Sequence, residues 1–345
     1  MLRDCLQYLS GRGDLHVTAL VHKRELCDYP GIDYIEIPWS TGSWIKRLKC
    51  EYFTMYRISK ELPETHLWLS LHDTTPRVKA LRQAVYCHTT FPFMKMRESD
   101  WRMDYKIALF TLFTRFAYGT FVHRNRYLIV QQNWMRESLS RLVNFDIRRI
   151  IVAPPAFQPL PIPEGRMQET PVTFLYPATP DVHKDFETLC QAASLLEQRI
   201  GKGKFRVVLT VRGDENKYAR FLKTRWGMVA SIDFHGFMSR EELAHAMGEA
   251  RCLVFSSRAE TWGLPISEFL PSGKPMILPD LPYAHETAAG ASRVAFFPVM
   301  DAETLADTMQ DLIEKRTSAF RPVPANVFQE PYAPDWASLF QILLS

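Results

Sequence analysis

Two glutamates around a Gly-Leu-Pro tripeptide are the residues of this sequence whose types and spacing could do chemistry. Glu260 and Glu268 stand on either side of Gly263, Leu264 and Pro265. The apolar run before them predicts a buried strand, and the proline predicts the first turn of a helix. Free N–H groups at a helix start attract anions, and a glycine there lets a ligand approach the backbone. We therefore predict a site where Glu268 accepts ribose hydroxyls and Glu260 lies beside a phosphate-linked group.

The elements that must position this site alternate between strand and helix. Short apolar runs are separated by helix-length amphipathic segments, which predicts βαβ units and a mostly parallel sheet. Open α/β sheets bind ligands beyond the carboxyl ends of their strands, and the predicted helix start at Gly263 to Pro265 follows the carboxyl end of such a strand. The predicted strands lie near residues 16–22, 33–38, 67–72, 83–88, 127–132, 149–154, 172–177, 205–211, 232–236, 252–257, 275–280 and 293–298.

A proline-rich stretch divides the chain into two predicted domains. Five of the thirteen residues 153–165 are prolines, which remove backbone donors and fix φ, so this stretch predicts a stiff linker. We predict a first domain at 1–153, a linker at 154–170 and a second domain at 171–325. Residues 326–345 contain a final amphipathic helix, whose apolar stripe is expected to pack across the groove between the domains.

The first domain begins with an unusual order of elements. Its opening residues predict a helix that Gly11 or Gly13 closes, and a strand follows at once. A doubly wound domain normally opens on a strand, then a loop, then that helix. We therefore expect this domain to lack its opening strand, which would leave neighbouring strands with unpaired backbone groups.

Composition places the chain among globular proteins, and its charge is uneven. Of its 345 residues 46% are hydrophobic and 23% charged, enough to bury a core. The first 155 residues carry 23 Lys and Arg against 15 Asp and Glu, hence +8, and the remainder carries 19 against 23, hence −4. Two interpretations stay open: ordinary surface variation, or a basic half that lies near an anionic membrane or substrate.

The cysteines and the longest apolar run bear on the location of the protein. The six cysteines show neither a C-x-x-C pair nor zinc-ligand spacing, so we expect reduced thiols in a cytoplasmic protein. The run at 107–122 includes Arg115 and has 16 residues, so it is too short to span a bilayer. With its basic flanks it predicts either a packed helix or a helix in the membrane interface.

The chain resembles a known family at these residues. Glu260 and Glu268 with the intervening Gly-Leu-Pro, followed by residues 272–286, resemble the E-x7-E signature of retaining GT-B glycosyltransferases of family 4, the glycosyl transferases group 1. The resemblance extends to 174–192, 232–247 and 85–93 and so covers nearly the whole chain. Residues 70–76, 85–93 and 130–135 are further similar to members that assemble bacterial lipopolysaccharide O-antigen. It implies two Rossmann-like domains facing a cleft.

The resemblance implies roles for the residues of the second domain. Glu268 would hold the nucleotide ribose, and Glu260 would contact the donor sugar. The backbone amides of Gly263 and Leu264 would meet the diphosphate or the sugar. Lys184 matches the basic residue that neutralises the leaving diphosphate.

Two further matches complete the implied active site. The backbone near Phe237 and Met238 would face the nucleotide base. His88, in the first domain, matches a histidine that reaches the sugar near the reacting centre. The catalytic set implied by the resemblance is thus Glu260, His88 and Lys184.

One position departs from the family pattern. The family usually has an arginine five residues before its lysine, and here that position is Thr179. Arg258 or Arg212 could supply the missing charge. Because the leaving diphosphate needs cationic help, this departure and the missing strand also allow an inactive nucleotide-sugar-binding paralogue.

The resemblance implies a sugar transfer with retention from a nucleotide-sugar donor to a glycan or polyprenyl-linked acceptor. It implies no metal, no cofactor besides the donor and no nucleic acid. We expect a cytoplasmic protein, and its basic first domain would allow a peripheral position on the cytoplasmic face of the inner membrane. A GT-B sugar-nucleotide epimerase is a less favoured alternative. A nicotinamide oxidoreductase is disfavoured because no G-x-G-x-x-G follows a strand.

Overall fold

The computed structural model of the chain describes residues 1–156, 158–163 and 171–345. These form two compact units. Unit 1 contains Met1–Thr89, Phe113–Ala156 and Phe328–Ser345, and unit 2 contains Thr90–Leu112 and Phe157–Val327. Residues 90–112, which the sequence reading placed in the first domain, therefore pack with the second. Of the predicted linker 154–170, residues 157 and 164–170 lie outside the described residues.

Unit 2 is built around a parallel sheet. Its described strands follow the order β12-β11-β10-β7-β8-β9, and every neighbouring pair is parallel. The direction of winding reverses between β7 and β10, so the loops after these two strands meet at a topological switch point. The strands are β7 (Val172–Tyr176), β8 (Phe205–Leu209), β9 (Ile232–Phe234), β10 (Cys252–Val254), β11 (Met276–Pro279) and β12 (Val294–Phe297).

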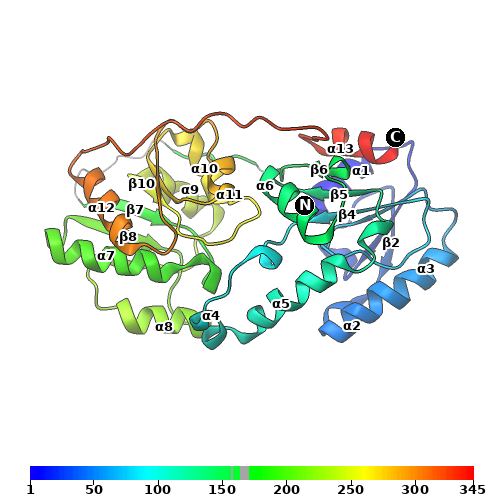
Figure 1. The fold of residues 1–345 in the computed structure, drawn as a ribbon, viewed down its shortest axis with the longest axis horizontal. Coiled ribbons are helices and arrows are strands. Elements are labelled where there is room, and N and C mark those ends of the chain that lie inside the picture. The colour runs from blue at the N-terminus through cyan, green and yellow to red at the C-terminus, as the bar shows by residue number, and fades with distance from the viewer. Residues whose placement is uncertain (157, 164–170) are drawn as a thin grey trace. The chain divides into compact units, whose positions relative to one another are not determined.

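Helices cover both faces of the sheet of unit 2. Figure 1 shows α7 and α8 on one side and α9 and α10 on the other. Side-chain caps start several of them: Ser239 and Glu242 form a capping box at α9, and Asn216 caps α8. The helices are α4 (Glu98–Met103), α7 (Phe186–Ile200), α8 (Lys217–Trp226), α9 (Arg240–Glu249), α10 (Leu264–Phe269), α11 (Pro282–Thr287) and α12 (Ala302–Ile313).

Unit 1 has two groups of parallel strands among its described residues. β1 (Val17–Val21) pairs with β2 (Ile32–Glu36), and the others follow the order β3-β4-β5-β6, with no ladder between β1 and β3. Its remaining strands are β3 (Leu67–Ser70), β4 (Arg82–Cys87), β5 (Tyr127–Val130) and β6 (Ile150–Val152). Its helices are α1 (Leu2–Ser10), α2 (Trp44–Lys49), α3 (Met55–Glu61), the second half of α5 (Tyr105–Gly119), α6 (Asn133–Val143) and α13 (Trp336–Leu344), with a π-helical turn η3 (Cys50–Thr54) between α2 and α3.

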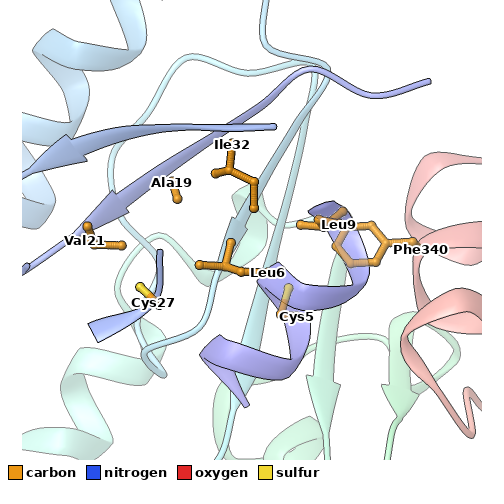
Figure 2. Close-up of a cluster of buried hydrophobic side chains, with 8 residues drawn as sticks. All are labelled: Cys5, Leu6, Leu9, Ala19, Val21, Cys27, Ile32 and Phe340. Atoms are coloured by element: carbon orange, nitrogen blue, oxygen red, sulfur yellow. The ribbon is translucent and has the colours of Figure 1, made fainter. Parts of the chain in front are cut away.

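The two ends of the chain pack together in unit 1. Figure 2 shows Phe340, from α13, against Leu9 and Cys5 of α1, in a cluster that continues to β1 and β2. Arg82 at the start of β4 donates to the carbonyl of Leu344 at 2.6 Å, so α13 also closes on the second sheet. The predicted packing of this helix across an interdomain groove stays a prediction.

The predicted strands are confirmed. Every one of the predicted runs overlaps one of β1 to β12, because β-branched and aromatic residues bounded by turn residues fit a buried parallel strand. The cysteines, all among the described residues, are free and buried. In the described part of the chain no helix is both long and apolar enough to cross a membrane.

Candidate functional site

The switch point of unit 2 brings two of the predicted catalytic residues together. Leu175 of β7 lies opposite Leu253 of β10, so the loops that follow these strands are neighbours. Lys184 ends the 3₁₀ turn η7 (Val182–Lys184) after β7, and Glu260 lies in the loop after β10. Their Nζ and Oε1 atoms are 2.5 Å apart, and both side chains are largely buried. A cation and a carboxylate thus meet where an open α/β sheet binds its ligand.

Hydrogen bonds to backbone carbonyls fix the position of Lys184. The hydroxyl of Tyr176, at the end of β7, donates to the carbonyl of Lys184 at 2.5 Å. The Ser256 hydroxyl donates to the carbonyl of Asp185 at 3.0 Å, and the Arg258 amide donates to the carbonyl of His183 at 2.8 Å. The last two bonds join the loop after β10 to the loop after β7, so the segments that carry Lys184 and Glu260 are held together.

Glu268 and the Gly-Leu-Pro segment lie next to this pair in the sequence. Gly263 has φ +88°, which favours glycine, and a Cβ there would come within 3.2 Å of Ile266 Cδ1. α10 begins at Leu264, so the proline is its second residue and not its first. Glu268 is mostly buried, and burial raises the pKa of its carboxyl group. Its ion partner Arg240 is 3.9 Å away, beyond hydrogen-bond distance, so the carboxylate could still accept hydrogen bonds from a ligand.

Arg258 and Arg212 both have acidic neighbours. The Arg258 guanidinium is buried and donates to Asp100 Oδ1 at 2.9 Å and to the Val182 carbonyl at 3.0 Å. Arg212 is exposed and pairs with Asp214 at 2.8 Å. Arg258 is therefore neutralised beside the Lys184 loop. A direct role of either arginine at a diphosphate stays a prediction.

A buried ion network lies beside the site, and the sequence alone did not predict it. Asp100, on α4, accepts from both Arg97 and Arg258, and Arg97 also contacts Asp185 at 3.1 Å and Glu187 at 3.0 Å. Asp100 and Asp185 are fully buried. The contacts join parts of the chain that are far apart, with 90 positions between Arg97 and Glu187 and 158 between Asp100 and Arg258, so no local spacing indicates them. Asp185 also accepts a hydrogen bond from the Thr188 hydroxyl at 2.6 Å, at the start of α7.

His183, next to Lys184, is an uncharged member of the same edge. Burial, with the nearby Lys184 charge, lowers the pKa of His183 to about 4. The ring packs edge-on against Phe91, with centroids 5.7 Å apart. Neutral His183 therefore adds no positive charge at pH 7.

Phe237 and Met238 lie in the loop between β9 and α9, at the carboxyl edge of the same sheet. Phe237 is exposed and Gly236 before it has φ +99°. This is a position from which backbone groups can reach a ligand. Nothing in the structure assigns the two residues to a base, and that role stays a prediction.

The predicted first-domain residue His88 lies at the carboxyl edge of the second sheet of unit 1. It follows β4, and its backbone amide donates to Asp73 Oδ1 at 2.6 Å. The Tyr118 hydroxyl, on α5, donates to the same oxygen at 2.9 Å. The Nδ1 atom of His88 is 3.5 Å from that carboxylate and has no hydrogen-bond partner among the described residues. The Nδ1 side of the imidazole is thus buried against Asp73, and the side chain as a whole is 36% exposed.

A second polar group at this edge surrounds Glu51, which the sequence reading did not single out. Its buried carboxylate accepts from Arg47 at 2.9 Å and from Thr74 at 2.7 Å, and His72 lies 3.5 Å away. Burial lowers the pKa of His72. Across the described residues of both units, no group of three His, Cys, Asp or Glu side chains is placed to hold a metal.

The part of the chain that contains these residues matches a known protein family. Residues 162–325 match the model of the family "Glycosyl transferases group 1", and the matched range contains Lys184, Glu260, Gly263 and Glu268. This matched range, called the group 1 domain, covers a little less than half of the 345 residues. The resemblance drawn from the Glu260–Glu268 spacing is thereby confirmed at the level of the family.

A curated relative and two solved structures extend the comparison beyond the group 1 domain. The O-antigen chain mannosyltransferase B of Escherichia coli is 26% identical over 179 residues, which are 49% of this chain and 47% of that protein. Sucrose-phosphate synthase of Thermosynechococcus elongatus superposes with a TM-score of 0.62 at 17% identity, over 92% of this chain and 84% of that one. WaaG, described as a glycosyltransferase involved in lipopolysaccharide biosynthesis, gives a TM-score of 0.59 at 15% identity, over 91% and 86%.

These matches fix the fold of the whole chain. The alignment with the curated relative spans about half of that protein's length. The structural matches include both units. The fold class is GT-B, and each of the two units is Rossmann-like. The group 1 domain lies within unit 2.

Proposed function

We propose that this protein is a glycosyltransferase that moves a sugar from a nucleotide-sugar donor bound by unit 2. The observation that supports this most directly is the Lys184–Glu260 pair at the switch point of a group 1 domain. Such domains typically use nucleotide-sugar donors. A lysine there would balance a diphosphate, and the glutamate would accept from sugar hydroxyls.

The neighbouring residues would bind the other parts of the donor. Glu268 would accept hydrogen bonds from two ribose hydroxyls, because its buried carboxylate has a distant ion partner and spare acceptor capacity. The amides of Gly263 and Leu264 would face the diphosphate. Phe237 and Met238 would present their backbone to the base.

The reaction would proceed with retention and without a metal. The bond between the sugar's anomeric carbon and the diphosphate oxygen breaks, and Lys184 with the backbone amides stabilises the leaving charge. The acceptor hydroxyl attacks from the same face, and its proton passes to the departing phosphate oxygen. Positioning of both partners would contribute much of the acceleration.

Unit 1 would serve the acceptor. His88 would contact the sugar near the reacting centre with its partly exposed imidazole, whose Nδ1 side faces the Asp73 carboxylate at 3.5 Å. The acceptor would be a glycan or polyprenyl-linked saccharide of a bacterial surface polysaccharide such as O-antigen, as the curated relative's name suggests. The +8 charge of the first 155 residues supports a peripheral position at the cytoplasmic face of the inner membrane.

Nucleotide binding tests the donor site. Thermal unfolding of the full chain is measured with UDP, GDP, ADP and dTDP, for the wild type, Glu268→Ala and the control Glu249→Ala. A ligand at about 100 times its Kd adds roughly 2.7 kcal/mol, which raises Tm by several degrees. We expect one nucleotide to raise Tm in the wild type and the control but not in Glu268→Ala. No shift with any nucleotide would contradict the donor site.

A nucleotide-sugar binder that transfers nothing is the second candidate. Thr179 replaces the family's arginine, and Arg258 is neutralised by Asp100, so positive charge at the diphosphate is reduced. This candidate predicts the same nucleotide-dependent shift in Tm but no transfer of radiolabelled sugar to any lipid-linked acceptor. Turnover with one acceptor would exclude it.

A further inference from the structure

The outward face of α5 is more apolar than its inward face. In the half of α5 that belongs to unit 1, Phe113 and Phe116 are 63% and 70% exposed, whereas Thr114 is buried. Tyr118, also buried, donates to Asp73 beside His88. An ordinary surface helix buries its apolar stripe and exposes its polar one. Here the inward face is polar because it supports the His88 site, and the apolar face has been turned outward.

A second helix of unit 1 exposes apolar side chains in the same way. None of the six residues of α2, all of them described, is buried, although they include Trp44 and Ile45. Ile45 is 79% exposed, and Phe53 in the following turn η3 is 66% exposed. A helix with large apolar residues and no buried face needs a partner outside its own fold.

The turn that follows α2 contacts the segment that follows α5. Tyr52, in η3, packs edge-on against Phe121, just after the end of α5, with ring centroids 5.6 Å apart. The exposed apolar residues of α2, of η3, of the unit 1 half of α5 and of its end are called the apolar surface, and they are Trp44, Ile45, Leu48, Phe53, Phe113, Phe116 and Phe121. An exposed group of this size on one unit marks a contact with another phase or molecule.

The charge around the apolar surface is positive. Residues 44–49 contain three Lys or Arg and residues 105–126 contain four, and neither segment contains Asp or Glu. Lys46, Lys49, Arg115 and Arg124 are exposed. Two copies of the chain meeting at this surface would bring like charges together. An anionic partner matches it, and Trp, Phe and Lys together are typical of side chains at a lipid interface.

We propose that the apolar surface docks unit 1 onto an anionic lipid bilayer. The apolar side chains would enter the boundary between headgroups and acyl chains, while the basic residues attract anionic headgroups, each by about 1 kcal/mol. α5 has 15 residues and is about 22 Å long, so it would lie in the interface and not cross a core of about 30 Å. The inference rests on the proposed function, because a lipid-linked acceptor would then reach the His88 edge from the membrane to which α5 is docked.

Vesicle flotation of the full chain tests this proposal. Vesicles of phosphatidylcholine alone and of phosphatidylcholine with 30% phosphatidylglycerol are compared, at low and high salt. The test variant is Ile45→Gln with Phe116→Gln, and the matched control is Met228→Gln, since Met228 is 93% exposed in unit 2. We expect the wild type and the control to bind the anionic vesicles, with binding weakened by salt. Binding of the test variant should fall by about tenfold or more.

Three outcomes would overturn the proposal. These are equal binding of the test variant, equal binding of the wild type to neutral vesicles, and failure of the wild type to bind the anionic vesicles. If the wild type fails to bind and sedimentation shows a dimer that the test variant abolishes, the surface is an interface between copies. The nucleotide-dependent shift in Tm is measured on the same variants. Because its residues lie in unit 2, a retained shift with lost vesicle binding separates this proposal from the donor site.

Discussion

The carboxyl edges of the sheets of the two units differ in how they hold polar groups. In unit 2 the edge is formed by one continuous sheet among the described residues, and its charges are paired: Lys184 with Glu260, and Arg258 with Asp100. In unit 1 the strands form two groups, and the edge of β3 and β4 carries His72 and His88 beside carboxylates.

This difference shows two ways of preparing a site. Paired, buried charges in unit 2 are fixed by the fold and suit a ligand that is itself highly charged. The unit 1 edge is set by hydrogen bonds to Asp73 and Glu51, and it keeps the imidazole of His88 partly exposed, which suits a neutral hydroxyl-bearing ligand. Four experiments would break or sharpen this comparison.

The largest effect is expected from Asp100→Ala. This change removes the carboxylate that two arginines share and leaves their charges buried without it, which destabilises a protein by about 3 to 5 kcal/mol. We expect Tm of unit 2 to fall by on the order of 10 °C. Differential scanning calorimetry measures this, and Glu98→Ala, on the same helix in an exposed pair with Arg102, is the control. A shift no larger than the control's would show that the network does not hold α4.

Turnover should separate the two edges. Lys184→Met should lower kcat by about 10² to 10³, the size found when one stabilising group for developing charge is lost. His88→Ala should lower it by about tenfold, as for one hydrogen bond of about 1.4 kcal/mol. Radiolabelled sugar transfer measures both.

A double variant distinguishes chemistry from structure at Lys184. Lys184→Met leaves Glu260 without its partner, so part of its effect could come from the lost ion pair. Adding Glu260→Gln removes the orphaned charge and should restore Tm. Turnover of the double variant is compared with that of Glu260→Gln alone, and we expect the double variant to be slower still. Equal turnover of these two variants would make Lys184 a structural residue only.

The smallest effect is a pH dependence of stability in unit 2. The pKa of His183 is lowered by burial to about 4 from a usual 6.5, so below pH 6.5 the unfolded chain binds the proton that the folded chain refuses. The stability that neutral His183 allows is fully present above pH 6.5 and is lost as the pH falls towards 4. Urea unfolding at pH 7 and pH 5 should therefore show a smaller loss of unfolding free energy in His183→Asn than in the control His245→Asn, whose side chain is exposed on α9. Equal losses would contradict the buried, neutral state of His183.

Much of the fold could be predicted because the signals are local. Each strand is a short apolar run bounded by turn residues, so its existence depends on neighbours in sequence. The segment 90–112 was assigned to the wrong compact unit, since its attachment depends on Arg97 and Asp100 meeting residues near position 185. Buried ion pairs between distant segments have no spacing that a sequence shows.

The donor-side residues could be singled out for a similar reason. Glu260, Gly263 and Glu268 lie within nine residues, so their spacing is visible in the sequence, and the structure adds that Gly263 has a positive φ, which only glycine adopts without strain. The Lys184–Glu260 contact spans 76 positions. The family resemblance implied a separate role for each of these two residues, and only the structure shows that they form an ion pair.

The sequence alone determined the twelve strands, the group 1 motif and the positive charge of the first half, because each is a property of composition or short spacing. Only the tertiary structure decided that Arg258 pairs with Asp100, and that α5 turns Phe113 and Phe116 outward. Apolar periodicity gives the stripe on a helix but not the side that it faces. That side depends on the free energy of all the contacts that Thr114 and Tyr118 make inside the unit.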